Sequence, residues 1–360
     1  MDDASVDRTQ RADVPCEHRT VEWYKLENER LLEALRVREA RVARMEDDLV
    51  LLAERSETLD RIVSGGWWRL RLRLMRLFAV VSFVRRGLPQ REMTVERDPL
   101  SRDALASRAE RLRSQTDRLS SGLPVSLHRH AKDSSVRRVI CSLADENYLG
   151  PLSICSVGLE QYATRHGWDV AIHVGSLDLA RPIAWSKLLF VSRLLEQYEE
   201  VWWVDADAVI VDTAPDIASL IDVDKDLYIV EHRWDEPSGR RAVNSGVVLF
   251  RRSDWTTSLI EAIWHREEFI DHPWWENTAM LDLFGYQIPD DGTPPIPGVP
   301  TAWMDRVKLI GLEWNSTENA SAAVAPVIRH IGRRPTVAVL EQMMTGELRR
   351  ANAVGVARET

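Results

Sequence analysis

Two aspartates, Asp205 and Asp207, are set into an apolar run that spans residues 201–211. Val, Ile and Trp favour extended backbone, and an apolar run of this length is typical of a buried strand. Side chains alternate along a strand, so both carboxylates are expected on one face of it. Two close carboxylates need a compensating cation, which a divalent ion shared with a nucleotide diphosphate would supply. The alternative is a strand that ends at a loop, with both aspartates in water.

Chain length and composition limit the classes of protein to consider. The 360 residues suggest one large domain or two, and the net charge of -9 argues against nucleic acid as a partner. The cysteines, Cys16, Cys141 and Cys155, have neither metal nor redox spacing, so we expect reduced thiols in the cytoplasm. The polar, acidic start is unlike a secretory signal, and no stretch is long and apolar enough to predict a membrane span.

The first part of the chain predicts an association module. Residues 1–20 are polar, and we expect them to be disordered. Residues 21–60 fit a heptad pattern with neither Pro nor Gly, which predicts a coiled coil and hence a homodimer. Asn28 at a core position would help to fix its register. The alternative is a single amphipathic helix that packs on the rest of the protein.

The next segment, residues 61–91, is basic and amphipathic. It combines Trp, Arg and aliphatic residues, and no acidic residue lies between Asp60 and Glu92. This composition is typical of a segment in the interface of an anionic membrane, so we predict a peripheral protein on the cytoplasmic face. A partner-binding helix or a basic edge strand are alternatives, because the Arg–Leu alternation also fits period two.

The remaining residues predict an α/β domain. Residues 92–135 are expected to be a linker with one helix at 105–119, residues 136–340 the α/β domain, and residues 341–360 a helical, frayed tail. Strands that alternate with helices imply a parallel sheet with helices on both faces, and such sheets bind ligands beyond the carboxyl ends of their strands. The expected strands are residues 139–143, 168–174, 201–211, 226–230, 242–250, 307–310 and 327–331. The expected helices are residues 152–166, 182–198, 254–268 and 274–283.

Six short motifs follow one another between residues 137 and 335. They are Gln161-Tyr162-Ala163-Thr164-Arg165-His166-Gly167-Trp168, Trp185-Ser186-Lys187, Trp203-Val204-Asp205-Ala206-Asp207, Asn244-Ser245-Gly246, Trp274-Trp275-Glu276-Asn277 and His330-Ile331-Gly332. In kind and order these resemble the motifs of glycosyltransferase family 34, which contains galactosyl-, mannosyl- and xylosyltransferases. Two motifs depart from the family pattern, because Asn277 stands in place of Gln and the His-to-Gly spacing is one residue tighter. Residues 145–149 also resemble the first-strand loop of the related glycogenin-like transferases, which touches the nucleotide base.

The resemblance implies a GT-A (Rossmann-like) fold and transfer of a hexose or pentose from a UDP- or GDP-sugar, with retention at the anomeric carbon. The acceptor would be a glycan or a lipid. The resemblance assigns Asp205, Asp207 and His330 to Mn²⁺ or Mg²⁺. It assigns a donor-binding role to Asp145, Tyr148, Lys187, Asp205, Asn244, Ser245 and Gly246. It places Glu276 and Asn277 beneath the anomeric centre as catalytic residues.

Two other functions are compatible with parts of the pattern. A Mg²⁺-dependent phosphotransferase or phosphohydrolase could use the same aspartates, although it needs a Gly-rich loop or a nucleophilic Asp, for which Asp145 is the one candidate. A non-catalytic coiled-coil scaffold with a sugar-binding domain would be expected to lack the metal residues. For a retaining transferase, either a carboxylate nucleophile such as Glu276 or a front-face displacement would serve. Because Asn277 is shorter than Gln, the identity of the stabilising group stays open.

Overall fold

The computed structural model describes residues 98–130, 136–234, 239–289, 293–318, 320, 322–332 and 334–359, with side chains up to residue 353. The predicted disorder at residues 1–20, the coiled coil at 21–60 and the basic segment at 61–91 lie outside the described residues. None of the described helices is long and apolar enough to cross a membrane.

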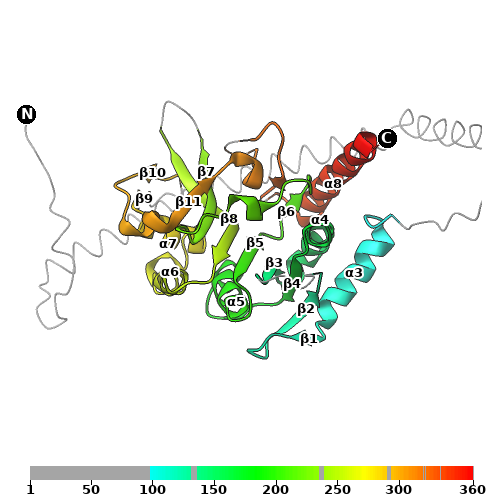
Figure 1. Ribbon diagram of the computed structural model, residues 1–360, viewed down its shortest axis with the longest axis horizontal. Helices are drawn as coiled ribbons and strands as arrows, with labels where there is room; N and C mark the ends of the chain where they lie inside the picture. Colours follow the sequence, from blue (N-terminus) through cyan, green and yellow to red (C-terminus); the bar gives the residue numbers. More distant parts are fainter. Residues whose placement is uncertain are drawn as a thin grey trace, which may run out of the picture. The chain divides into compact units, whose positions relative to one another are not determined.

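A mixed sheet of eight described strands forms the centre of the domain (Figure 1). Its order is β1 (Asp117–Arg118), β2 (Pro124–His128), β4 (Asp169–Val174), β3 (Arg138–Ala144), β5 (Glu200–Val204), β8 (Arg241–Arg251), β7 (Leu227–Arg233) and β11 (Val307–Ile310). The predicted parallel pairing is confirmed for β4, β3 and β5 and for β7 and β11, but not for β8, which runs antiparallel to both β5 and β7. Only residues 234–240 join β7 to β8. This connection is too short for the crossover that parallel strands need.

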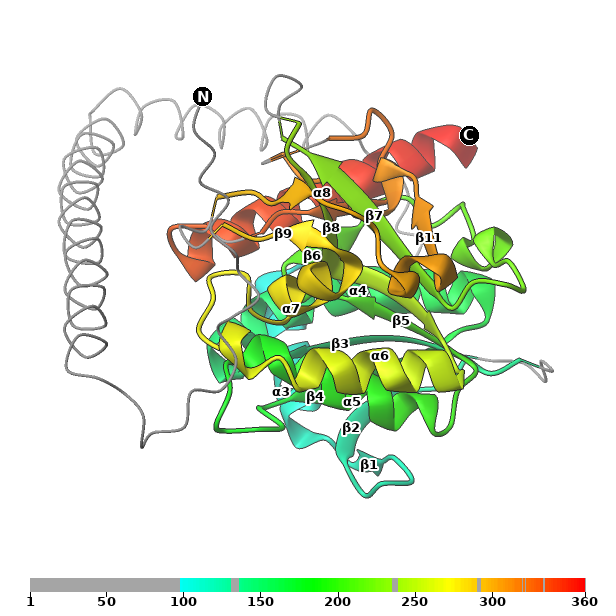
Figure 2. The same ribbon diagram turned by 90° about the vertical axis from the view of Figure 1, so that its left-hand side faces the viewer.

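Helices cover both faces of the sheet, which confirms the predicted α/β class (Figures 1 and 2). One face packs against α3 (Arg102–Ser114), α4 (Leu149–His166) and α8 (Val337–Glu359). The other packs against α5 (Ser186–Leu195), α6 (Asp254–Trp264) and α7 (Trp275–Phe284). Two small pairs complete the strands, β6 (Ala208–Ile210) with β12 (Ile328–His330) and β9 (Tyr286–Gln287) with β10 (Ile296–Pro297). Short 3-10 turns are η3 (Glu146–Tyr148), η4 (Ile183–Trp185), η5 (Ile217–Leu220), η6 (Glu267–Phe269), η7 (Ala302–Arg306) and η8 (Leu312–Asn315).

Alternation along β5 divides its apolar residues between the two cores. Trp202 packs in the core under α4, where its ring meets those of Tyr162 and Trp314 edge-on at 4.9 and 5.8 Å between centroids. Its neighbour Trp203 packs in the opposite core, which contains α5 and α7. Period-two alternation on a strand that is buried on both faces explains why the run is apolar throughout. The strand is therefore held rigidly up to Val204.

The apolar run 201–211 is not one strand, contrary to the prediction. β5 ends at Val204, β6 begins at Ala208, and the Ala208 amide donates to the Asp205 carbonyl at 3.0 Å across a tight turn. β6 then pairs with β12. Asp205 and Asp207 therefore lie in a turn, and the turn, not strand alternation, brings their side chains to the same side.

The segment predicted as a linker contributes to the domain. α3 lies within it and is confirmed as a helix, but it starts and ends earlier than predicted. Residues 124–128 form β2, which pairs antiparallel with β4 and, on its other side, with the edge strand β1. At the other end of the chain, α8 begins before the predicted tail. Its Leu340, Met344 and Leu348 are buried in the same core as α4.

Candidate active site

A cavity of about 600 Å³ opens where the sheet brings several strand ends together. β3 and β5 are parallel neighbours, so their carboxyl ends place Asp145 and Asp205 on one edge. β8 runs the other way, so its first half brings Asn244 to Gly246 to the same edge. All eleven predicted site residues line this cavity: Asp145, Tyr148, Lys187, Asp205, Asp207, Asn244, Ser245, Gly246, Glu276, Asn277 and His330.

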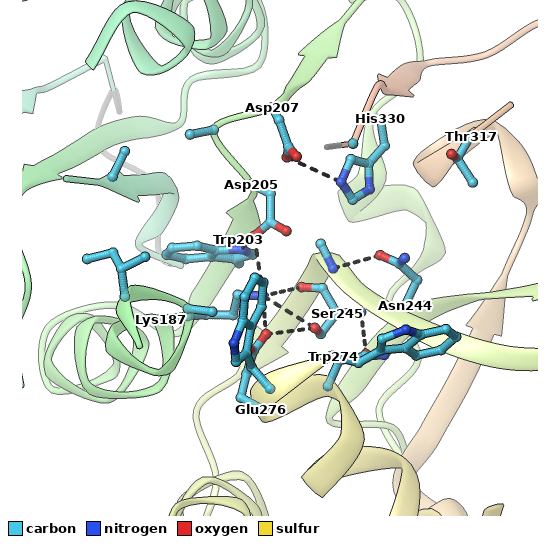
Figure 3. Close-up of a pocket in the computed structure, with 18 of the residues that line it drawn as sticks. Lys187, Trp203, Asp205, Asp207, Asn244, Ser245, Trp274, Glu276, Thr317 and His330 are labelled. Atoms are coloured by element: carbon cyan, nitrogen blue, oxygen red, sulfur yellow. Dashed lines mark hydrogen bonds and ion pairs between the residues drawn. The ribbon is translucent and has the colours of Figure 1, made fainter. Parts of the chain in front are cut away.

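Asp205, Asp207 and His330 form one group at the cavity, here called the metal group (Figure 3). β12 pairs with β6 in a register that sets His330 opposite Ala208, directly after Asp207. The Nε2 atom of His330 lies 3.3 Å from Oδ1 of Asp207. One potential ligand atom from each of the three residues lies within 4.8 Å of the others. The late His motif is therefore placed beside the aspartates by strand pairing.

Asn315, which the sequence analysis did not identify, holds His330. Its Oδ1 lies 2.9 Å from His330 Nδ1, and its Nδ2 donates to Asn244 Oδ1 at 3.0 Å. The side chain of Asn315 is fully buried. Because the amide nitrogen already donates to Asn244, Oδ1 accepts a hydrogen bond from the Nδ1–H of His330. Nε2 is therefore the nitrogen that faces Asp207, and it can bind a cation once it has lost its proton. This outer hydrogen bond is the arrangement usual for a metal-binding histidine.

Gly246 permits the close approach of His330. β8 is bulged opposite Ile229 and Val230, and the Gly246 carbonyl accepts from the Asp205 amide at 2.7 Å. A Cβ atom at Gly246 would lie 2.2 Å from Cε1 of His330. Any other residue at this position would displace the imidazole, so a glycine is needed here for steric reasons.

Lys187, Ser245 and Glu276 form a second, buried group, here called the lysine group (Figure 3). The ammonium of Lys187 contacts Glu276 Oε1 at 2.7 Å, the Ser245 carbonyl at 2.9 Å and Ser245 Oγ at 3.3 Å. It also lies 3.3 Å from Asp205 Oδ1, so it links the two groups. Ser245 Oγ donates to Glu276 Oε1 at 2.9 Å. Glu276 stands in the first turn of α7, where the helix dipole favours a carboxylate.

Asn277 and Asp145 bind backbone amides. Oδ1 of Asn277 accepts from the Ser245 amide at 2.9 Å, which fixes the bulge of β8 to α7. Oδ1 of Asp145 accepts from the amides of Asn147 and Tyr148 at 3.0 and 3.2 Å, and so caps the turn η3. Both residues line the cavity, but these carboxylate and amide oxygens already have protein partners.

The two groups perturb each other's protonation. Burial raises the pKa of Asp205, with Lys187 acting against the rise and Asp207 adding to it. Burial acts to raise the pKa of Asp207, but the facing His330 outweighs it and the pKa lies below its ordinary value. For His330, burial acts to lower the pKa, and Asp207 more than compensates, so the pKa is raised. The two opposite shifts favour the charged forms of Asp207 and His330, and hence an ion pair between them when no other cation is present.

The metal group fits a hard divalent cation. Its donor set is two carboxylates and one imidazole, and the imidazole is already oriented by Asn315. Both contacts of the Asp205 side chain, from Trp203 Nε1 at 2.6 Å and from Lys187 at 3.3 Å, use Oδ1. Oδ2 therefore has no hydrogen-bond partner among the described residues. Two carboxylates against one imidazole leave negative charge that a bound cation would neutralise.

Comparison with protein families identifies one related stretch. Residues 154–228 match the glycosyltransferase 34 model, described as the galactosyl transferase GMA12/MNN10 family. The matched residues run from α4 to the start of β7 and include Lys187, Asp205 and Asp207. This match confirms the predicted resemblance to family 34.

Individual proteins are similar over a comparable part of the chain. "Probable glycosyltransferase 2" of Oryza sativa subsp. indica is 30% identical over 112 residues, covering 28% of this chain and 22% of the relative. "Xyloglucan 6-xylosyltransferase 1" of Arabidopsis thaliana is 29% identical over 108 residues, covering 28% of this chain and 23% of the relative. The chain thus spans less than a quarter of the length of these curated relatives.

Two solved structures resemble a larger part of the chain. A glycosyltransferase involved in glycosylation of the major capsid of PBCV-1 is 16% identical, with a TM-score of 0.41 over 58% of this chain and 98% of that chain. Mouse xyloside xylosyltransferase 1 is 11% identical, with a TM-score of 0.34 over 56% of this chain and 99% of that chain.

Proposed function

We propose that this protein is a metal-dependent, retaining glycosyltransferase that moves a hexose or pentose from a UDP- or GDP-sugar to a glycan or lipid acceptor. The observation that carries the proposal is the convergence of the metal group and the lysine group in one cavity of about 600 Å³. Such a volume is typical of a small-molecule site. The family match at residues 154–228 supports the same reaction class.

The metal group would hold Mn²⁺ or Mg²⁺ through Asp205, Asp207 and His330. When bound, the cation neutralises the charge that develops on the departing diphosphate, so no general acid is needed there. Asn315 keeps Nε2 of His330 directed at this position, and the β5–β6 turn holds the two carboxylates. The base of the donor would lie near Asp145 and Tyr148, at the carboxyl end of β3.

The lysine group would act on the donor sugar. Glu276 lines the cavity, and both of its protein contacts use Oε1. Its negative charge stabilises the positive charge that develops at the anomeric carbon. Lys187 and Ser245 hold this carboxylate in one position, so the site does not reorganise as the reaction proceeds. Either a glycosyl ester on Glu276 or front-face attack by the acceptor would give retention.

The structure disfavours phosphotransfer through an Asp145 nucleophile. Oδ1 of Asp145 accepts two backbone amides at the cap of η3, which lowers its availability for attack on phosphorus. A non-catalytic scaffold is disfavoured as well, because all three residues of the metal group are present and close together.

The test is a panel of UDP- and GDP-linked hexoses and pentoses, incubated with the full-length protein and Mn²⁺ or Mg²⁺. We expect release of nucleoside diphosphate from at least one donor, abolished by EDTA and restored by Mn²⁺. The matched control is Asp224→Asn, which removes an exposed carboxylate on a loop outside the cavity and should leave release unchanged. Release that proceeds equally well in EDTA, or no release from any donor, would contradict the proposal.

We further propose that the basic segment at residues 61–91 holds the protein at the cytoplasmic face of an anionic membrane, and that residues 21–60 form a homodimeric coiled coil. The support is the pattern of Arg and Trp without acids in the first and of heptads in the second. Replacing Arg69, Arg73 and Arg76 together by Glu should release the full-length protein from phosphatidylserine vesicles. Sedimentation equilibrium of Leu35→Asp should show a monomer where the natural sequence shows a dimer.

A further inference from the structure

Two tryptophans form a stacked pair at the cavity, and the residues assigned so far do not include them. The rings of Trp234 and Trp274 are 5.7 Å apart between centroids, with 30° between their planes. Both line the cavity, and both are partly exposed. Trp234 follows the end of β7, and Trp274 precedes the first residue of α7. The pair is therefore built from two segments that are far apart in the sequence.

The backbone holds both tryptophans in place. The Trp234 amide donates to the Arg240 carbonyl at 3.1 Å, and the Trp274 amide donates to Nδ1 of His272 at 3.1 Å. Trp275, between Trp274 and Glu276, has φ of +46°, a left-handed conformation that costs a bulky residue about 1–3 kcal/mol. Such strain is typical of functional sites. Here the strained residue lies between Trp274 and Glu276, both of which line the cavity.

The tryptophan pair lies on a different side of the metal group from Asp145 and Tyr148, the residues proposed to lie near the base of the donor. The strand order β3, β5, β8, β7 puts Asp145 after β3, Asp205 after β5 and Trp234 after β7. In Figure 3 the indoles of Trp274 and Trp203 are drawn on opposite sides of Ser245. A donor that extends from Asp145 past Asp205 to Glu276 therefore leaves the two indoles uncovered beyond its sugar.

The charges of the cavity indicate what would bind there. The four carboxylates that line it, Asp145, Asp205, Asp207 and Glu276, face the cationic side chains of Lys187 and His330. Even with a divalent cation bound, the site offers little attraction to a second anion once the diphosphate is present. Indole faces, by contrast, contact the C–H groups of a pyranose ring without requiring charge. The pair thus suits a neutral ring rather than a phosphate-bearing one.

We propose that Trp234 and Trp274 form the acceptor subsite and that the acceptor is a neutral saccharide whose terminal ring stacks on them. This assignment rests on the proposed glycosyl transfer. It narrows the choice between glycan and lipid acceptors to the glycan, because a lipid phosphate would bring further negative charge to this cavity. The stacked ring sits next to the sugar held above Glu276, so its hydroxyl can reach the anomeric carbon.

The experiment uses the full-length protein, Mn²⁺ and the donor that the panel identifies. Neutral gluco-, xylo-, manno- and galacto-oligosaccharides are the probes, with polyprenyl phosphate in detergent as the comparison. We expect at least one oligosaccharide to accelerate release of nucleoside diphosphate and to become glycosylated. Trp234→Ala and Trp274→Ala should each raise the KM for that saccharide at least tenfold, a larger change than in the KM for the donor. Trp274→Phe should recover much of the loss because it restores an aromatic face.

The matched control is Trp255→Ala. Trp255 also belongs to a partly exposed tryptophan pair, 5.8 Å from Trp303 between ring centroids, but neither residue lines the cavity. Its loss should leave the KM for the saccharide unchanged. An unchanged KM in both Trp234→Ala and Trp274→Ala, or transfer to polyprenyl phosphate alone, would overturn the acceptor assignment while leaving glycosyl transfer intact. No turnover of any donor would instead refute the proposed function, and the acceptor subsite with it.

Discussion

The metal group and the lysine group share one cavity but differ in how their charges are balanced. In the metal group two carboxylates face one imidazole. In the lysine group the ammonium of Lys187 is surrounded by oxygens of Glu276 and Ser245 and by Asp205. An ammonium has three donors, so the contacts to Glu276 and Ser245 use its full capacity. The first group carries an excess of carboxylates over cations, and the second already contains its own cation.

This difference changes the interpretation of Lys187. The resemblance assigns it to the phosphate or the donor sugar, as a residue that meets the ligand directly. In the structure it is buried and engaged by protein oxygens. We therefore infer that Lys187 chiefly positions Glu276 and Asp205, and that the two groups should respond differently to substitution.

Asp207→Asn should produce the largest effect on activity. It removes a ligand from the metal group while keeping the shape of the side chain, so nucleoside diphosphate release should fall about a thousandfold, on the order of 4 kcal/mol. Circular dichroism and the unfolding midpoint should stay close to those of the natural protein. If this variant failed to fold, the metal group would matter for stability as the lysine group does, and the expected difference between the two groups would be contradicted.

Lys187→Met should act mainly on stability. It leaves Glu276 buried without its cation, which typically costs about 3–5 kcal/mol in the free energy of unfolding measured with urea. The double variant Lys187→Met with Glu276→Gln should regain part of this loss, because no unpaired charge is left. Lys308→Met is the matched control, since it breaks a partly exposed ion pair with Asp222 and should cost about 1 kcal/mol or less. Equal losses in the two lysine variants would contradict the assigned role.

Asn315→Ala should weaken metal binding about 10–100-fold, the usual effect of removing an outer hydrogen bond from a liganding histidine. Titration with Mn²⁺, followed by the paramagnetic signal of the free ion, measures the affinity without any turnover. Asn315→Asp keeps an acceptor for His330 Nδ1 and should retain more affinity than the alanine variant. The exposed Asn352→Ala on α8 is the control. Similar affinities in the alanine and aspartate variants would show that the contact to Nδ1 is unimportant.

The smallest expected effect concerns His232, which should make the free energy of unfolding depend on pH. Burial lowers its pKa from 6.5 to about 4 in the folded protein. Between these two values the unfolded chain binds a proton that the folded chain does not, so the free energy of unfolding decreases as the pH falls from 6.5 towards 4. The decrease attributable to this residue is at most about 3 kcal/mol.

His232→Gln should reduce that slope in urea unfolding experiments at several pH values. The exposed His265→Gln serves as its control. A slope that is identical in the His232 variant and the natural protein would exclude His232 as its source.

The aspartates of the metal group could be anticipated from the sequence, because two aspartates separated by one residue in an apolar run predict two carboxylates on one face of a strand. The structural reason was nevertheless wrong. A tight turn at Asp205, not continued strand alternation, brings the carboxylates together. The run is apolar on both sides of this turn, so periodicity alone gave no indication of where β5 ends. The closeness of His330 followed from a resemblance, and the strand pairing that causes it is a long-range contact.

The supporting residues were harder to predict. Asn315 lies in a short 3-10 turn with no motif around it, and its importance arises from burial and from its hydrogen bonds to His330 and Asn244. Similarly, β2 is a short strand, second from the edge of the sheet and next to charged residues, and its place in the sheet is evident only from its pairing with β1 and β4. Contacts between distant segments determine both features, and a single sequence contains little information about such contacts.

The pairing of β12 with β6 has a consequence for biosynthesis. Translation delivers the strands β3, β5 and β8 well before Ile328–His330 leave the ribosome, because the chain emerges from its N-terminus. Until then the turn at Asp205 has no partner strand, since Ile331 donates to the Asp207 carbonyl and Val211 donates to the Val327 carbonyl only in the completed pair. A nascent chain can thus assemble the centre of the sheet without a working site. The order of synthesis itself delays completion of the metal group until residues 328–330 have emerged.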